Sequence, residues 1–263
     1  MWLTSLLAAL VTALVTLFLV APAVMSILAG VSANYARGWN GGLTLSWVAQ
    51  VWEAYADTIF RSIVVALCTL AVTLAIGVPA AYALVRRGGT FARLVEEIVT
   101  LPVAIPGLAL ALALLIAYGG YGAFRSSIFF IVAGHVLYTL PFMLRAVMAV
   151  LSSFDWRALD EGGASLGASP SRRFVDIILP NARGGILAGA LTVVTLSIGE
   201  FNLTWMLHTP LTKTLPVGLA DAYASLRLEI ASAYTLVFFV MIMPLLLALQ
   251  WFASASDRAA MRA

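Results

Sequence analysis

Charge is scarce in this chain. Only 10% of its 263 residues are Asp, Glu, Lys or Arg, whereas an ordinary soluble domain carries about 25%. Apolar residues fill the gap: they make up 62% of the chain and raise the mean hydropathy to +1.01. This composition excludes an ordinary soluble domain and indicates a protein that is embedded in a membrane.

Residues that carry catalytic or metal chemistry are equally rare. The single cysteine, Cys68, excludes an internal disulfide and a Cys-based metal cluster. The two histidines, His135 and His208, fall in different segments, and no His-Glu-x-x-His zinc motif occurs. The single lysine, Lys213, follows Thr212 instead of the glycine of a Gly-x-x-x-x-Gly-Lys-Ser/Thr phosphate loop. We therefore expect no catalytic residue, no metal and no ATPase site in this chain.

The apolar residues are grouped in blocks long enough to cross a bilayer. A helix needs about 20 mostly apolar residues for this, and continuous runs favour helices over barrel strands, which alternate in polarity. The first block has no basic residue before it and is longer than a signal-peptide core, so we interpret it as a retained helix. The sequence predicts an all-α, polytopic membrane protein with one transmembrane domain over residues 1–263. Its six spans are expected at residues 3–29, 58–85, 98–118, 127–151, 184–207 and 231–252.

Lys and Arg predict the orientation, because short loops rich in these residues stay in the cytoplasm. With the N-terminus inside, the cytoplasmic side receives nine basic residues and the outer side five, so both termini are expected in the cytoplasm. The nine are Arg86, Arg87, Arg93, Arg157, Arg172, Arg173, Arg183, Arg258 and Arg262, and the five are Arg37, Arg61, Arg125, Lys213 and Arg227. This distribution explains the net charge of +3 without a nucleic-acid partner.

Two polar stretches on the expected outer side are too long for tight turns. Residues 30–57 carry Trp39, Trp47, Trp52 and Tyr55. Aromatic rings of this kind fit the interfacial belt of a membrane protein, and a docking surface for an external partner is the alternative. Residues 208–230 either cap the mouth of a pathway or form a connecting loop with a short helix.

The loop between the fourth and fifth expected spans, residues 152–183, has a helical pattern of its own. Residues 158–166 predict one short helix. Ser169 and Pro170 have the N-cap and first-turn proline of a second helix, which Pro180 is expected to end. Such an elbow offers an amphipathic knob to a partner's groove, but a passive connector fits the same pattern.

The same loop resembles the signature of the permease subunits of type I binding-protein-dependent ABC importers. That signature is Glu-Ala-Ala, three residues, Gly, nine residues and then Ile-x-Leu-Pro. Glu161, Gly167, Ile177, Leu179 and Pro180 match it in register. The six expected helices extend the resemblance over nearly the whole chain.

The departure from the signature lies at Gly162 and Gly163, which replace two alanines. Glycine keeps the helix surface small but costs about 1 kcal/mol relative to alanine. The resemblance implies a coupling helix at about residues 158–168 that inserts into a separate ATPase and drives rocking of the membrane helices. It implies a coupling role for Asp160, Glu161, Gly162, Gly163, Ala164, Gly167, Ile177, Leu179 and Pro180.

The resemblance also implies the remainder of an assembly in a bacterial inner membrane, surrounded by lipid. Two ATPase subunits would hydrolyse ATP with Mg²⁺, which leaves this chain without a cofactor of its own. A second permease would complete the pathway; a heterodimer is favoured over a homodimer because this branch often encodes two different permeases. An external solute-binding protein would deliver the solute.

Glu200 is the only acidic residue well inside an expected span. A charge at mid-bilayer costs about 2.5–3.5 kcal/mol on insertion scales, so it usually faces a partner or a water-filled cavity. With Thr195, Asn202 and Thr204 nearby, Glu200 is a candidate for the wall of the solute pathway; a structural bond to a neighbouring helix is the alternative. The Gly-Glu-Phe triplet here resembles one in permeases for sulfate, molybdate, polyamines, ferric iron, thiamine or phosphonates, so it leaves the sign of the solute's charge open.

These observations predict a membrane permease subunit of an ATP-driven importer. A polyamine is the leading substrate, with a phosphonate, ferric iron, thiamine or an oxyanion as alternatives. A secondary carrier driven by an ion gradient is the rival class, since it would share six helices and a buried carboxylate, but it would not need the loop signature. A membrane-embedded enzyme is a more distant alternative because no convincing catalytic pair occurs.

Overall fold

The computed structural model describes residues 2–260. Met1 and residues 261–263, which include Arg262, lie outside this description, as do the side chains of residues 2–3, 38–40, 249 and 252–260, which include Trp39 and Arg258. Within the described residues every named element is a helix and no β-strand occurs. The all-α prediction is confirmed.

Among residues 2–260, five helices are long and apolar enough to cross a membrane. They overlap the first, second, fourth, fifth and sixth expected spans, and the fifth is one continuous helical run over Pro170–Gly199. The elements that carry them are α1 (Trp2–Gly30), α2 (Ser46–Arg87), α6 (Ile128–Leu151), α9 (Leu179–Gly199) and α12 (Leu228–Ala260). Long apolar runs therefore located most of the membrane helices.

The third expected span is not one straight helix. The chain forms α3 (Gly89–Ala104) and α4 (Gly107–Tyr118), which are bent by 106° at the break between them. Ile105 is extended, with φ −90° and ψ 132°, because the residue before a proline is pushed out of the helical region. The continuous helix predicted over residues 98–118 is corrected to this bent pair, which counts as a sixth span only if both halves are taken together. After α4, the short helix α5 (Gly122–Arg125) leads into α6.

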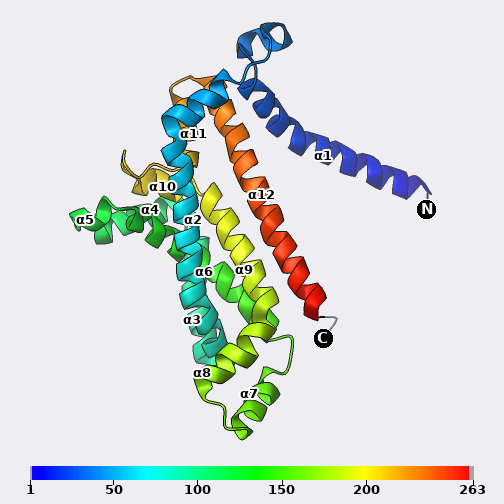
Figure 1. Ribbon diagram of the computed structural model, residues 1–263, viewed down its shortest axis with the longest axis vertical. Helices are drawn as coiled ribbons and strands as arrows, with labels where there is room; N and C mark the ends of the chain where they lie inside the picture. Colours follow the sequence, from blue (N-terminus) through cyan, green and yellow to red (C-terminus); the bar gives the residue numbers. More distant parts are fainter. Residues whose placement is uncertain (1, 261–263) are drawn as a thin grey trace. The chain divides into compact units, whose positions relative to one another are not determined.

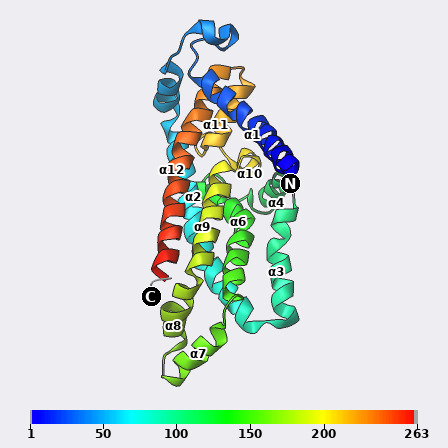
Figure 2. The same ribbon diagram turned by 90° about the vertical axis from the view of Figure 1, so that its right-hand side faces the viewer.

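The chain forms two compact units. One contains the residues up to Ile59 together with Val217–Met241, and the other contains Phe60–Pro216 together with the chain from Ile242 onward. In the second unit α6 and α9 lie side by side, and α3 contacts α6 (Figures 1 and 2).

Glycines allow the close packing of α6 against α9. A Cβ added at Gly185 would lie 2.5 Å from the carbonyl oxygen of Ala146, and one at Gly189 would lie 2.6 Å from Sδ of Met143. The Gly-x-x-x-Gly spacing puts both glycines on one face of α9. Small residues of this kind let membrane helices approach each other closely.

The apolar core of the second unit continues from these helices into the 152–183 loop. Val147 and Leu151 of α6 belong to the same buried cluster as Trp156 and Ile178 of the loop. Leu84, near the end of α2, joins this cluster. The loop is therefore anchored on the membrane helices by its own apolar side chains.

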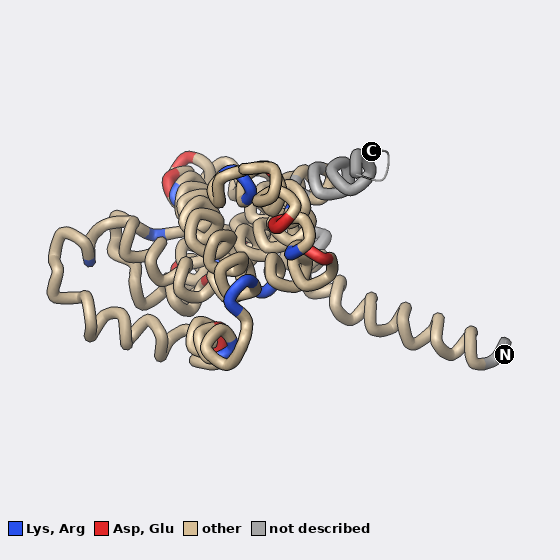
Figure 3. The backbone as a smooth tube through the Cα atoms, turned by 90° about the horizontal axis from the view of Figure 1, so that it is seen from below, with Lys and Arg blue, Asp and Glu red and all other residues tan. Residues whose placement is uncertain are grey.

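The first unit begins with α1, which carries no charged residue along its length (Figure 3). A 3₁₀ helix, η1 (Tyr35–Gly41), follows and is capped by the Asn34 side chain. The backbone N–H of Tyr35 donates to Oε1 of Glu229 at 3.2 Å, and Nε1 of Trp47 donates to the carbonyl oxygen of Ser32 at 2.9 Å. Most of the 30–57 stretch is thus helical, since η1 covers Tyr35–Gly41 and α2 already begins at Ser46.

The 208–230 stretch contains one short helix, α11 (Leu215–Ala224). At its start, the backbone N–H of Leu215 donates to Oγ of Ser62 at 2.8 Å, within the second unit. In the first unit, Arg227 donates to the hydroxyl of Tyr55 at 3.2 Å. The stretch is therefore an ordered connection with a helix inside it.

Candidate functional site

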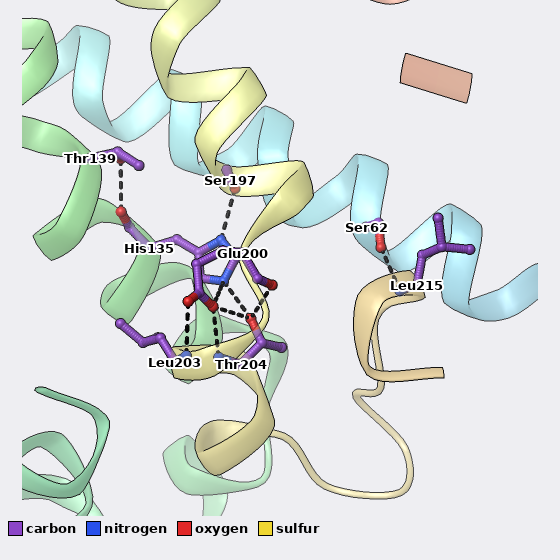
Figure 4. Close-up of polar contacts among 8 residues, drawn as sticks. All are labelled: Ser62, His135, Thr139, Ser197, Glu200, Leu203, Thr204 and Leu215. Atoms are coloured by element: carbon purple, nitrogen blue, oxygen red, sulfur yellow. Dashed lines mark hydrogen bonds and ion pairs between the residues drawn. The ribbon is translucent and has the colours of Figure 1, made fainter. Parts of the chain in front are cut away.

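The fifth expected span is interrupted near its end. Helix α9 stops at Gly199 and α10 (Asn202–Leu207) begins after two residues. Glu200 at the break is extended, with φ −72° and ψ 119°. Its carboxylate accepts hydrogen bonds from the backbone N–H groups of Leu203, at 2.8 Å, and Thr204, at 2.9 Å (Figure 4). Glu200 therefore satisfies N–H groups at the start of α10 that have no partner within the helix.

His135 of α6 connects this capped break to α9. Its Nδ1 atom lies 2.8 Å from Oγ of Ser197, and its Nε2 atom lies 2.8 Å from Oγ1 of Thr204 (Figure 4). The Thr204 hydroxyl donates its single proton to Glu200, where Oε2 lies 3.0 Å away and the backbone carbonyl oxygen 3.3 Å away. We assign the other two hydrogen bonds from this constraint. His135 carries its proton on Nε2 and donates to Thr204, and Ser197 donates to Nδ1 of His135.

The four side chains of His135, Ser197, Glu200 and Thr204 form what we call the polar cluster. It is closed to solvent: His135 is 1% exposed and the side chain of Glu200 only 10%. Sequence reasoning had placed Glu200 and Thr204 together but missed His135 and Ser197 as their partners. His135 lies 62 residues from Ser197 and 69 from Thr204, so no local spacing links them.

The two broken spans meet at this cluster. A Cβ added at Gly107, the first residue of α4, would lie 3.2 Å from Cβ of Asn202 and 3.7 Å from Oε1 of Glu200. Helices α4 and α10 are in contact, and each begins at this point. The carboxylate of Glu200 thus lies beside the first turns of two short helices, whose positive ends favour a negative charge.

The four sequence-predicted pathway residues separate into two groups. Glu200 and Thr204 turn into the polar cluster, where their polar atoms have protein partners. Thr195 and Asn202 are exposed, and the Thr195 hydroxyl donates to the carbonyl oxygen of Leu191 at 2.7 Å. The geometry favours a structural role for Glu200, which was the alternative left open by the sequence.

The 152–183 loop folds into the expected helical elbow. Helix α7 runs over Trp156–Ser165 and is capped by Asp155, whose Oδ1 atom accepts from the N–H of Ala158 at 3.2 Å. Gly167 has φ +81°, a conformation that favours glycine, and it makes the turn out of α7. The predicted N-cap is confirmed: Oγ of Ser169 accepts from the N–H of Arg172 at the start of α8 (Pro170–Arg173).

The expected coupling residues lie on both sides of α7. Asp160 and Gly163 are buried, whereas Glu161, Gly162, Ala164 and Gly167 are exposed. Arg173, one of the basic residues expected on the cytoplasmic side, is only 9% exposed. It donates to Oδ2 of Asp160 at 2.8 Å and to the Asp160 carbonyl oxygen at 3.0 Å.

The prediction that Pro180 ends the second helix is wrong. After α8 the chain makes a π-helical turn, η2 (Phe174–Ile178), and continues without interruption into α9. The N–H of Leu179 bonds to the carbonyl oxygen of Phe174, five residues earlier. The missing N–H of Pro180 falls where the hydrogen-bond register changes from π to α, a position that tolerates it. Ile177 and Leu179 are half-buried along this run.

Comparison with known proteins agrees with this geometry. Residues 73–262 match the family described as "Binding-protein-dependent transport system inner membrane component". A putative 2-aminoethylphosphonate transport system permease of Salmonella typhimurium is 27% identical over 71% of this chain and 72% of its own length. A probable molybdenum ABC transporter permease of Haloferax volcanii is 32% identical over 67% of this chain and 68% of its own. A sulfate transport system permease of Synechocystis is 28% identical over 68% and 71%.

A solved structure supports the fold. A bacterial ABC transporter involved in the import of the acidic polysaccharide alginate contains a chain that aligns with a TM-score of 0.72 and 15% identity, over 95% of both chains. At this identity the match shows the fold alone. The family match covers most of the chain and includes the 152–183 loop, so the chain belongs to the binding-protein-dependent inner membrane components and is a type I ABC importer permease.

Proposed function

We propose that this permease forms half of a solute pathway and is coupled to a separate ATPase through the 152–183 loop. The observation that carries the proposal is the exposed face of α7. Leu166, at the C-cap of α7, is 89% exposed and Leu159 is 43% exposed. Figure 1 shows α7 beyond the ends of α6 and α9, where a partner can reach it.

The 152–183 loop packs against the membrane helices on one side and is open to a partner on the other. Its inner side joins the apolar core through Trp156 and Ile178. On its outer side Glu161 and Gly162 are exposed, and a Cβ at Gly162 would meet nothing within 4 Å. A partner that binds the outer side and shifts the loop would therefore also shift the membrane helices that pack against its inner side.

The broken spans support a pathway beside Thr195 and Asn202. In hydrocarbon every backbone polar group needs a partner, so non-helical backbone is tolerated only against protein or a water-filled cavity. Ile105, Pro106 and Gly199 at the two breaks are exposed, as are Thr195 and Asn202. We place the solute pathway along this face, with the second permease subunit opposite.

A small phosphonate or oxyanion is the substrate that we now favour over a polyamine. The Glu200 side chain is only 10% exposed and its two oxygens already accept from Leu203 and Thr204, so it is not available for direct contact with a cationic solute. The relatives described above carry names that refer to 2-aminoethylphosphonate, molybdenum and sulfate. Ferric iron, thiamine and polyamines become the alternatives to be tested.

The remaining parts of the proposal follow the family. The importer contains two ATPase subunits, a second permease that we expect to be a different chain, and an external solute-binding protein. The chain lies in the bacterial inner membrane with the 152–183 loop and both termini in the cytoplasm. Hydrolysis of ATP with Mg²⁺ takes place on the partner subunits.

Reconstitution tests the proposal. The chain is assembled in proteoliposomes with the ATPase, permease and binding protein encoded beside it, and uptake of 2-aminoethylphosphonate, molybdate, sulfate and spermidine is measured. We expect ATP-dependent uptake of one of the first three. Uptake that continues without ATP but stops when an ion gradient is dissipated would contradict the proposal and favour a secondary carrier.

A further inference from the structure

A buried ion pair joins the two helices of the 152–183 loop. Helix α7 turns three residues inward, Trp156, Asp160 and Gly163, and one of them is a carboxylate. A buried carboxylate destabilises the fold unless a cation and hydrogen bonds compensate it. Nη1 of Arg173 lies 2.8 Å from Oδ2 of Asp160, and the two side chains are only 11% and 9% exposed.

A residue of a membrane helix completes this pair. The hydroxyl of Tyr82, on α2, donates to Oδ1 of Asp160 at 3.3 Å. The Tyr82 ring also packs edge-on against Trp156, with centroids 5.8 Å apart, and against Phe174 of η2 at 5.4 Å. One side chain of α2 thus contacts both arms of the loop.

The contact between the arms leaves little room for independent movement. A Cβ added at Gly163 would lie 2.7 Å from Cδ1 of Ile177 and 3.2 Å from Cδ of Arg173. The stem of Arg173 therefore lies directly on α7, while its guanidinium holds the Asp160 carboxylate. A displacement of α7 must displace Arg173, and through Asp160 it also pulls on Tyr82.

We propose that Tyr82, Asp160 and Arg173 are positioning residues that transmit movement of α7 directly to α2. We call these three residues the latch. This inference rests on the coupling role of the loop proposed above. The loop is joined to α6 and α9 by the backbone, and the latch adds a second connection, through side chains, by which movement of the loop reaches α2.

The first test removes a single hydroxyl. Tyr82→Phe keeps the ring contacts with Trp156 and Phe174 but deletes the donor to Asp160. In the complete importer in proteoliposomes, ATP hydrolysis and solute uptake are measured in parallel. We expect hydrolysis to persist while uptake per ATP falls about fivefold or more, the range of an ordinary coupling free energy.

A second variant and its combination with the first test the linkage. Asp160→Asn should lower uptake per ATP in the same way. The double variant Tyr82→Phe/Asp160→Asn should be no worse than Asp160→Asn alone, because Tyr82 acts through Asp160. Asp176→Asn is the matched control: its partner Arg172 is 3.2 Å away, but both side chains are exposed, so its loss should leave the ratio unchanged.

The outcomes separate this inference from the proposed function. The inference is overturned if the unsubstituted chain couples uptake to ATP and Tyr82→Phe and Asp160→Asn do so equally well. It is also overturned if hydrolysis and uptake fall together at a constant ratio, since that is the result of a merely structural defect. Failure of the unsubstituted importer to take up any solute with ATP would instead defeat the proposed function.

Discussion

Thr204 gives both of its donors to one atom of Glu200. Its backbone N–H lies 2.9 Å and its hydroxyl 3.0 Å from Oε2 of the Glu200 carboxylate. The same hydroxyl accepts from His135 on its other side, at 2.8 Å. The first turn of a short helix thus stabilises a negative charge inside the membrane domain. Removal of that charge should lower the stability of the fold.

Substitution of Glu200 tests this role. Glu200→Gln keeps the size but removes the charge and replaces one acceptor with an NH₂ group, which faces the N–H groups of Leu203 or Thr204. We expect a loss of about 1–3 kcal/mol of stability, seen as a lower melting midpoint in detergent, with an unchanged KM for the solute. Glu53→Gln, at an exposed position of α2, is the control. A raised KM with an unchanged melting midpoint would show instead that Glu200 contacts the solute.

Thr204 offers a matched pair of variants. Thr204→Ser keeps the hydroxyl, so the hydrogen bonds that join Ser197, His135, residue 204 and Glu200 stay intact and stability should change little. Thr204→Val keeps the shape but leaves the His135 donor and one carboxylate oxygen without this partner, at a cost of about 1–3 kcal/mol. Thermal unfolding of the two purified variants distinguishes them. Equal midpoints would argue that the hydroxyl is not part of the cluster.

The glycines of α9 and α7 should respond in opposite directions to the same change. In Gly185→Ala, the new methyl group meets backbone atoms of Ala146 at 2.5 Å and Val147 at 3.0 Å, and we expect a loss of about 1–3 kcal/mol from overpacking. Gly162→Ala adds a methyl group in open space and should stabilise α7 by about 1 kcal/mol. Melting midpoints provide the comparison, and a Gly185→Ala protein as stable as the parent would refute the close α6–α9 contact.

The exposed side of the loop should control coupling without controlling folding. Glu161→Lys reverses an exposed charge, and Gly167→Asp places a side chain where φ is +81°. We expect both variants to reach the membrane and to hydrolyse ATP with the partner subunits, while uptake per ATP drops about tenfold, which is within the ordinary range of coupling free energies. Membrane fractionation controls for insertion. Normal uptake per ATP in both variants would refute coupling through this loop.

Local patterns predicted the parts of the fold that depend on local physics. The long apolar runs located α1, α2, α6, α9 and α12 because burial in lipid requires about 20 consecutive apolar residues. The cap at Ser169 followed from its own side chain and the proline after it. Five residues of the loop signature, spread over the 20 positions from Glu161 to Pro180, identified the family.

The rest depended on contacts that no local window contains. The sequence did not predict the bend of 106° between α3 and α4, because the angle is set by what α4 packs against. Asp160 was expected to contact a partner, and its burial depends on Arg173 and Tyr82, 13 and 78 residues away. The sequence does contain one signal of this burial. Trp156, Asp160 and Gly163 are spaced by four and three residues, so they share one face of a helix. If the tryptophan is taken as buried, Asp160 must point inward with it.

The π-helical turn between α8 and α9 has a consequence for the direction in which α7 points. A π turn holds one residue more than an α-helical turn, and each residue of an α-helix rotates the chain by about 100°. Deletion of one residue within Phe174–Ile178 would therefore restore a regular helix and swing α7 by about a quarter of a turn around the axis of α9, away from Tyr82. In this chain, the length of the nine-residue interval in the signature therefore sets the direction in which α7 points around the axis of α9.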